Sequence, residues 1–229
     1  MREATGVVFD LDDTLYPERR FALSGYAAVA TVVGAENGMP ADVLYRFLVG
    51  RFRQRGREGL LQSLCAAFAL PLTDVPRLVE VIRTHVPRLR LPRPSRQVLC
   101  ELRARGHRLA ILTNGLPATQ RGKVKALGIE SLVDAVVYAQ EHAPAGKPAQ
   151  VCFMAAVRRL DVQASHTVFV GDHPEKDIAG AAAAGLRPIW LPGGRLAARP
   201  VTADAVARSL ADVPGLVARL LEEHHVAPC

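Results

Sequence analysis

The sequence predicts an α/β protein: a parallel sheet flanked by helices, with an all-helical segment inserted near the start. Three observations lead to this prediction. Short apolar runs alternate with helical patterns over most of the 229 residues, as in a parallel sheet covered by helices on both faces. The runs are continuously apolar, which is typical of strands buried on both sides. One interval, residues 18–90, contains helical patterns only.

The strand and helix signals follow one another along the chain in a regular order. Helices are predicted where Pro opens a segment and Gly closes it. Strands are predicted at 6–10, 108–114, 134–139, 166–172 and 187–191, and helices at 95–106, 117–128, 148–160 and 174–185. A short edge strand and a final helix are predicted within 204–225.

The helical insertion is bounded by Pro17 and by the segment "LPRP" at 91–94. Its own helices are predicted at about 18–35, 41–54, 58–69 and 74–86. We therefore predict two domains, an α/β core formed by 1–16 and 92–229, and an all-α helical bundle formed by 17–91.

Composition narrows the class of protein. Apolar residues make up 49% of the chain, enough for a substantial core, and no apolar run reaches the roughly 18 residues of a membrane span. The first residues lead directly into a strand, so we expect no signal peptide. The net charge of +7 comes mostly from scattered Arg, so we expect a solvated surface and no nucleic-acid partner. The cysteines have no close-spaced pairs and predict reduced thiols in a cytoplasmic protein (Cys65, Cys100, Cys152 and Cys229). We expect the protein to be a monomer or a homodimer.

Polar residues follow four of the predicted strands. Ligands of open parallel sheets lie beyond the carboxyl ends of the strands, so we expect these side chains to converge there. They are Asp10 and Asp12 after the first strand, Thr113 and Asn114 at the end of the second, Lys147 after the third, and Asp172 with Asp177 after the fourth.

Such a cluster indicates a metal and a phosphoryl group. Two carboxylates 4 Å apart repel by roughly 4 kcal/mol at a dielectric constant near 20, so they need a cation. All-oxygen ligands favour Mg²⁺, and Lys147, the Thr113 hydroxyl and the amides of the turn suit a phosphoryl group. One carboxylate can attack phosphorus and form an aspartyl-phosphate. A second, two residues away, can transfer the protons.

Four segments together resemble the haloacid dehalogenase-like (HAD) hydrolase superfamily. They are "FDLDDTLYP", "ILTNG", "GKP" and "GDHPEKD", and they occur in the order of that family. The resemblance covers nearly the whole chain and implies a Rossmann-like core. It also implies that the helical insertion is a cap domain that closes over the site and excludes water.

The resemblance implies a role for each matching residue. Asp10 would be the nucleophile and Asp12 the general acid/base, with the Asp12 backbone carbonyl on Mg²⁺. Lys147 would steady the nucleophile and the phosphate. Thr113 and Asn114 would bind phosphate, and Asp172 and Asp177 would complete the metal site, Asp177 directly or through water.

The same resemblance bears on the reaction. Dehalogenases of the family lack the second Asp of the first motif, so Asp12 favours the phosphatase branch. We expect a Mg²⁺-dependent phosphatase for a small phosphorylated metabolite, of the nucleotidase or phosphoglycolate type. A phosphosugar mutase of the same fold and a non-catalytic binding or regulatory module remain as alternatives.

Several neighbouring residues have structural interpretations. Asp13 is expected to serve the turn after the first strand, and His173 another turn. The segment "GRFRQRGRE" is placed between two helices of the insertion. Its arginines form either a solvated basic face or a substrate-specificity loop that contacts an anionic group (Arg51, Arg55 and Arg57).

Overall fold

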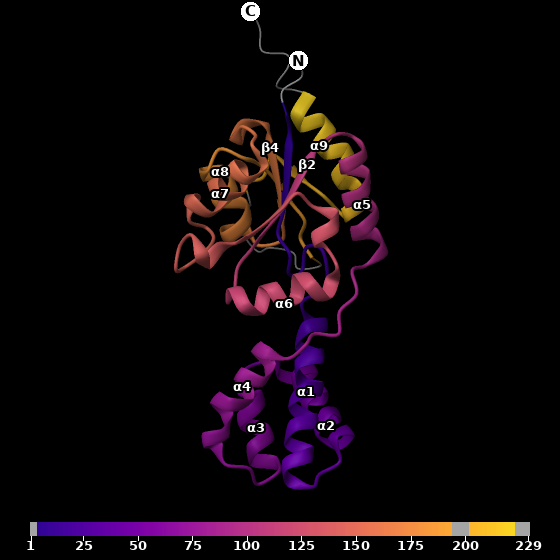
Figure 1. Ribbon diagram of the computed structural model, residues 1–229, viewed down its shortest axis with the longest axis vertical. Coiled ribbons are helices and arrows are strands. Elements are labelled where there is room, and N and C mark those ends of the chain that lie inside the picture. The colour runs from indigo at the N-terminus through magenta and orange to yellow at the C-terminus, as the bar shows by residue number, and fades with distance from the viewer. Residues whose placement is uncertain (1–3, 194–201, 223–229) are drawn as a thin grey trace, which may run out of the picture. The chain divides into compact units, whose positions relative to one another are not determined.

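The computed structural model describes residues 4–193 and 202–222 of the chain. It divides into two compact units, one formed by Met1–Pro17 with Arg90–Cys229 and the other by Glu18–Leu89 (Figure 1). Each unit has its own core and is described separately.

The first unit is built on a parallel sheet of six strands in the order β3-β2-β1-β4-β5-β6. The strand that carries the first motif, β1, lies between β2 and β4, so that Phe9 is in register with Ile111 on one side and Val170 on the other. The strands are β1 (Gly6–Phe9), β2 (Arg108–Thr113), β3 (Ala135–Tyr138), β4 (Thr167–Gly171), β5 (Arg187–Trp190) and β6 (Ala205–Val206).

Helices cover the two faces of this sheet, with α5 and α9 on one side and α7 and α8 on the other (Figure 1). The strands between these layers are apolar and buried, because both of their faces meet helices. One core cluster joins Val8 and Phe169 of the sheet to Phe153 of α7. The helices are α5 (Arg93–Ala104), α6 (Pro117–Leu127), α7 (Gln150–Leu160), α8 (Gly180–Ala183) and α9 (Val213–Glu222).

The second unit contains helices only, with a core of their inward-facing apolar side chains such as Tyr26, Leu44, Leu64 and Leu78. Its helices are α1 (Arg19–Asn37), α2 (Ala41–Arg55), α3 (Leu60–Ala67) and α4 (Val75–Thr84). Short 3₁₀ helices lie in both units, at Leu72–Asp74, Glu130–Leu132, Ala139–Glu141, Ala164–His166 and Leu210–Asp212.

The predicted fold class is confirmed, and most predicted elements lie within about two residues of the observed ones. The clearest difference is the helix expected at 174–185. It begins as a π-helical turn, η5 (Pro174–Ala179), and continues as the short α8. The His173 side chain caps this turn by accepting hydrogen bonds from two backbone amides, 3.3 Å each. The part of the predicted final helix beyond Glu222 lies outside the described residues.

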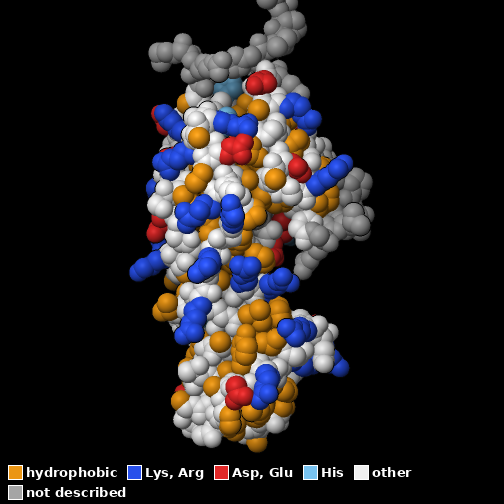
Figure 2. All heavy atoms as spheres, turned by 90° about the vertical axis from the view of Figure 1, so that its right-hand side faces the viewer, with side chains coloured by type: hydrophobic (Ala, Val, Ile, Leu, Met, Phe, Trp, Pro, Cys, Tyr) orange, Lys and Arg blue, Asp and Glu red, His pale blue; other side chains and the backbone are white. Residues whose placement is uncertain are grey.

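Three expectations from composition can be compared with the structure. No described helix is long and apolar enough to cross a membrane. Figure 2 shows Lys and Arg side chains scattered over the visible face, without one dense basic patch. The three cysteines that the structure describes, Cys65, Cys100 and Cys152, are free thiols.

Candidate active site

Asp10 follows β1 directly, at the carboxyl edge of the sheet. Its backbone amide donates to the Val170 carbonyl at 2.9 Å, which ties it to β4. The next residue, Leu11, is fully buried and anchors the turn. The Asp10 side chain is only 9% exposed, so the sheet fixes a nearly buried carboxylate.

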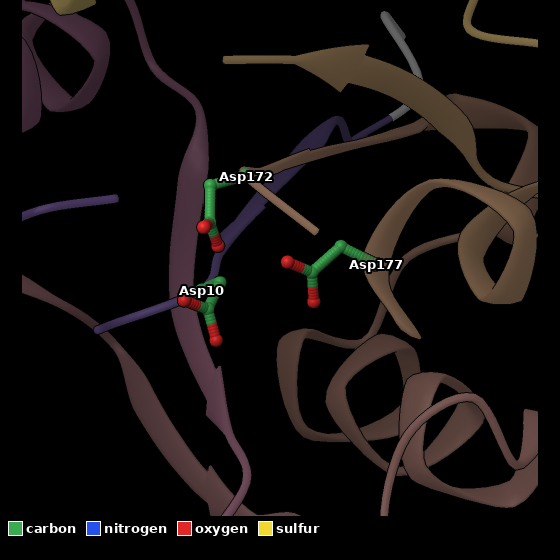
Figure 3. A group of neighbouring side chains, drawn as sticks. All are labelled: Asp10, Asp172 and Asp177. Atoms are coloured by element: carbon green, nitrogen blue, oxygen red, sulfur yellow. The ribbon is translucent and has the colours of Figure 1, made fainter. Parts of the chain in front are cut away.

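Three carboxylates meet at this edge: Asp10, Asp172 and Asp177, which point toward one another in Figure 3. Their oxygens lie within 4.8 Å of one another. Asp172 follows β4, and Asp177 is brought back to it by η5, where the His173 amide donates to its Oδ2 at 3.0 Å. Gly171 permits this approach, since a Cβ there would lie 2.6 Å from Asp177.

Lys147 joins two of these carboxylates. Its buried Nζ donates to Asp10 Oδ1 and to Asp177 Oδ1, each at 2.6 Å. Burial opposes the lysine charge, but the two carboxylates outweigh it and raise the pKa of Lys147. Lys147 therefore remains a fixed cation between Asp10 and Asp177.

The cluster is nevertheless short of positive charge. Burial raises the pKa of Asp10 to about 8, and the Asp177 charge adds to this effect, against the attraction of Lys147. Burial and the same Asp177 charge raise the pKa of Asp172 to about 6. Three carboxylates and one lysine leave a charge of about −2 when all are ionised, which a divalent cation would balance. The all-oxygen donor set fits a hard ion such as Mg²⁺.

The Asp12 carboxylate does not belong to this group. Lys123 of α6 donates to its Oδ1 and Oδ2 at 2.9 and 2.7 Å. Tyr16 donates its hydroxyl to Oδ1 at 2.5 Å, and Gln120 donates to Oδ2 at 3.3 Å. Asp12 thus has a separate set of polar partners, two residues along the chain from Asp10.

Sequence reasoning missed Gln120 and Lys123, yet a signal was present. Positions 120, 123, 124 and 127 form the inward stripe of α6 at helical spacing, and all four are buried. Two polar residues in an otherwise apolar stripe indicate a buried polar partner.

Thr113 and Asn114 lie after β2, as predicted, but their side chains are engaged within the protein. The Thr113 hydroxyl donates to Gln120 Oε1 at 3.2 Å. Asn114 donates to the Lys147 carbonyl at 3.1 Å and accepts from its amide at 2.8 Å. Asn114 therefore braces the loop that presents Lys147. Gly146, at φ 67°, makes room for it, since a Cβ there would lie 2.6 Å from Asn114 Oδ1.

Asp13 has the structural role expected of it. It adopts a left-handed conformation with φ 60°, and its amide donates to the Tyr16 carbonyl at 2.9 Å. This turn brings Tyr16 back toward Asp12. Of the three acidic residues after β1, Asp10 and Asp12 therefore belong to the candidate site, and Asp13 belongs to the turn.

Two of the three arginines considered for a specificity loop lie in a helix, and contact of these side chains with an anionic group stays a prediction. Arg51 and Arg55 lie within α2, where Arg51 donates to the Ser63 hydroxyl at 3.2 Å and Arg55 is exposed. Only Arg57 lies in the following turn, where it pairs with Glu18 at 2.8 Å. Because α2 continues through the arginine segment, the basic side chains spread around a helix. Arg57 also lines a cavity of about 190 Å³ within the helical unit, beside Tyr26.

With this geometry in place, comparisons with known proteins define the family. Residues 4–185 match the model of the haloacid dehalogenase-like hydrolases. The chain therefore belongs to the HAD-like hydrolases, as the four segments predicted.

Three known proteins illustrate the breadth of this family. The chain is 34% identical over 205 residues to a ribulose-1,5-bisphosphate 5-phosphatase of Halopiger xanaduensis, covering 81% of this chain and 84% of the relative. It is 31% identical over 197 residues to a glyceraldehyde 3-phosphate phosphatase of Methanopyrus kandleri, covering 82% and 84%. A crystal structure of a 2-haloacid dehalogenase from Pseudomonas syringae matches with a TM-score of 0.63 at 27% identity, covering 94% and 99%. The predicted phosphatase branch agrees with the names of the first two.

Proposed function

We propose that this protein is a Mg²⁺-dependent phosphatase that hydrolyses small phosphosugars through a phosphorylated Asp10. One observation carries the proposal: three carboxylates converge around a buried lysine at the end of the central strand. This arrangement can hold a divalent cation and a phosphoryl group side by side.

The proposed reaction has two steps. A carboxylate oxygen of Asp10 attacks phosphorus, the bond to the leaving oxygen breaks, and Asp12, which enters this step as the neutral acid, gives that oxygen its proton. In the second step water attacks the same phosphorus and loses a proton to Asp12, which releases phosphate and frees Asp10. Lys147 stabilises the negative charge of Asp10 and of the phosphoryl oxygens throughout.

A bound Mg²⁺ would be held by Asp10, Asp172 and Asp177, with the Asp12 backbone carbonyl as the further ligand that the family resemblance implies. Its charge would neutralise the phosphoryl oxygens and lower the raised carboxyl pKa values. The chain's own contribution is to keep these carboxylates together although they repel.

The choice of a phosphosugar follows from the relatives. Two of them bear names with phosphorylated sugar substrates, and each aligns over more than four-fifths of this chain. Within the predicted class of small phosphorylated metabolites, we therefore propose phosphosugars ahead of nucleotides and phosphoglycolate. We further propose that the helical unit, Glu18–Leu89, acts as the cap and contributes to selectivity.

Phosphate release from glyceraldehyde 3-phosphate, ribulose 1,5-bisphosphate and para-nitrophenyl phosphate, with and without Mg²⁺, tests the proposal. We expect Mg²⁺-dependent release that Asp10→Asn abolishes. Lys176→Met is a matched control, since this exposed lysine lies near the cluster without being part of it. Undiminished release by Asp10→Asn would contradict the mechanism.

The dehalogenase neighbour motivates one comparison. Halide needs no proton when it leaves, whereas an alkoxide does, and this chain has Asp12 with its own polar partners in a suitable place. We therefore expect no chloride release from 2-chloropropionate under conditions where phosphate esters are hydrolysed. Chloride release without phosphatase activity would favour the dehalogenase reaction instead.

A further inference from the structure

A second buried lysine, Lys123, faces the proposed acid/base. Its side chain is only 3% exposed, and lysine is rarely buried unless its charge is paired. Both Asp12 carboxylate oxygens lie within 2.9 Å of its Nζ. These two contacts hold the Asp12 carboxylate against α6.

Two other side chains reach the same carboxylate. Tyr16 donates to Oδ1 at 2.5 Å, and this residue is 2% exposed. Gln120 donates to Oδ2 at 3.3 Å and accepts from Thr113 at 3.2 Å. Gln120 and Lys123 are three residues apart on α6, so one helix face contributes both. A Cβ on Gly115 would lie 2.5 Å from Gln120 Nε2, so the turn after β2 leaves room for this arrangement.

The charges of the site also divide into two sets. Asp10, Asp172 and Asp177 share Lys147 and retain net negative charge, which suits a divalent ion. Asp12 and Lys123 form a pair of zero net charge with a side-chain separation of 2.7 Å. A cation is therefore attracted less strongly to the Asp12 carboxylate than to the three carboxylates of the first set.

We propose that Lys123 is a positioning residue that, with Tyr16 and Gln120, holds the Asp12 carboxylate where a proton must be delivered to the leaving oxygen. The inference rests on the proposed function and extends it to α6. Lys123 acts through Asp12 and does not itself contact the phosphoryl group.

Leaving groups of different basicity test this role. An alkoxide, as from glyceraldehyde 3-phosphate, needs a proton in order to leave, whereas para-nitrophenolate leaves without one. kcat/KM reports the steps up to departure of the leaving group. For Lys123→Met we expect kcat/KM to fall on the order of 10²-fold with glyceraldehyde 3-phosphate, because a misplaced acid loses most of its contribution. With para-nitrophenyl phosphate we expect a change of about threefold or less.

The matched control is Lys125→Met, which removes the same charge from an exposed position of the same helix. It should leave both kcat/KM values unchanged within about twofold, as surface changes away from a site usually do. Equal losses with the two substrates in Lys123→Met, with the fold intact by circular dichroism, would overturn the inference while leaving the phosphatase proposal standing. Absence of activity in the wild type with both substrates would instead overturn the proposed function, and the inference with it.

A second variant covers the case in which Lys123→Met does not fold. Tyr16→Phe removes one donor to Asp12 and leaves no charge unpaired. It should lower kcat/KM for glyceraldehyde 3-phosphate by about tenfold, with a much smaller effect on para-nitrophenyl phosphate. A loss that is the same for both substrates would show that these donors stabilise the fold and do not position the acid.

Discussion

Replacing Lys147 by Met should destabilise the α/β unit strongly when Mg²⁺ is absent. Lys147 lies 2.6 Å from an oxygen of Asp10 and of Asp177, and each contact corresponds to a gross attraction of about 6 kcal/mol at a dielectric constant near 20. Desolvation of the three groups offsets much of this attraction. Removal of one partner of a buried ion pair typically costs about 3–5 kcal/mol. Loss of Lys147 also raises the pKa of Asp10 further, because its attraction no longer opposes the effect of burial, and uptake of a proton by this carboxyl keeps the cost within that range.

Thermal unfolding in a chelating buffer measures the effect. For a domain of this size, a loss of 3–5 kcal/mol corresponds to a decrease in Tm of about 6–20 °C. The control, Lys176→Met, removes a nearby exposed lysine and should change Tm by no more than about 2 °C. If Lys147→Met were as stable as this control without Mg²⁺, Lys147 would not be the counter-ion of a charged cluster, and the electrostatic reasoning for the site would be refuted.

Three further predictions concern the metal, the packing and the pH dependence. Mg²⁺ at about 100 times its Kd should raise the free energy of unfolding of the wild type by about 2.7 kcal/mol. In Asp172→Asn much of this gain should be lost. If thermal unfolding at increasing Mg²⁺ concentrations showed the same gain for the variant as for the wild type, Asp172 would not be a metal ligand. Gly171→Ala should weaken Mg²⁺ binding measured by calorimetry, because the new Cβ would lie 2.6 Å from Asp177; unchanged affinity would show that Asp177 can shift without consequence. Burial, aided by Arg105, lowers the pKa of His107 below its ordinary value of 6.5, so the stabilisation by neutral His107 is present above that pH and is lost as the pH falls through the lower folded-state pKa. Urea unfolding of the wild type and of His107→Gln should therefore show a stability difference that changes in favour of the variant on acidification. A difference that stays constant with pH would contradict the lowered pKa.

The strands and the principal carboxylates could be predicted because their signals are local. Val7 to Phe9 form an apolar run that ends in Asp10, and the parallel arrangement then places Asp172 beside it. The pairing of Lys123 with Asp12 could not be predicted as readily, because the two residues are 111 positions apart and only the packing of α6 brings them together. The contact of the Asn114 side chain with the Lys147 backbone likewise joins positions far apart in the chain, and phosphate binding by Asn114 stays a prediction.

Two local features were also missed, each for a physical reason. The π-helical turn at η5 carries Asp177, whose partner Lys147 lies 30 residues earlier in the chain, and such a distant contact is not visible in the local sequence. A loop is one of the two interpretations of the arginine segment, yet Arg51 and Arg55 lie in α2, which ends at Arg55. Arginine is a good helix former, and its charge suits the last turn of a helix.

The central place of β1 has a consequence for how the chain acquires its fold during synthesis. β1 is made first, yet its neighbours in the sheet begin only at Arg108 and Thr167. The helical unit, Glu18–Leu89, forms from one continuous segment that is complete before either neighbour exists. A nascent chain is therefore expected to contain a folded helical bundle while β1, the apolar strand that precedes Asp10, is still unpaired. During that interval the unpaired strand can associate with other chains. The residue proposed for catalysis therefore follows a strand that pairs late in folding.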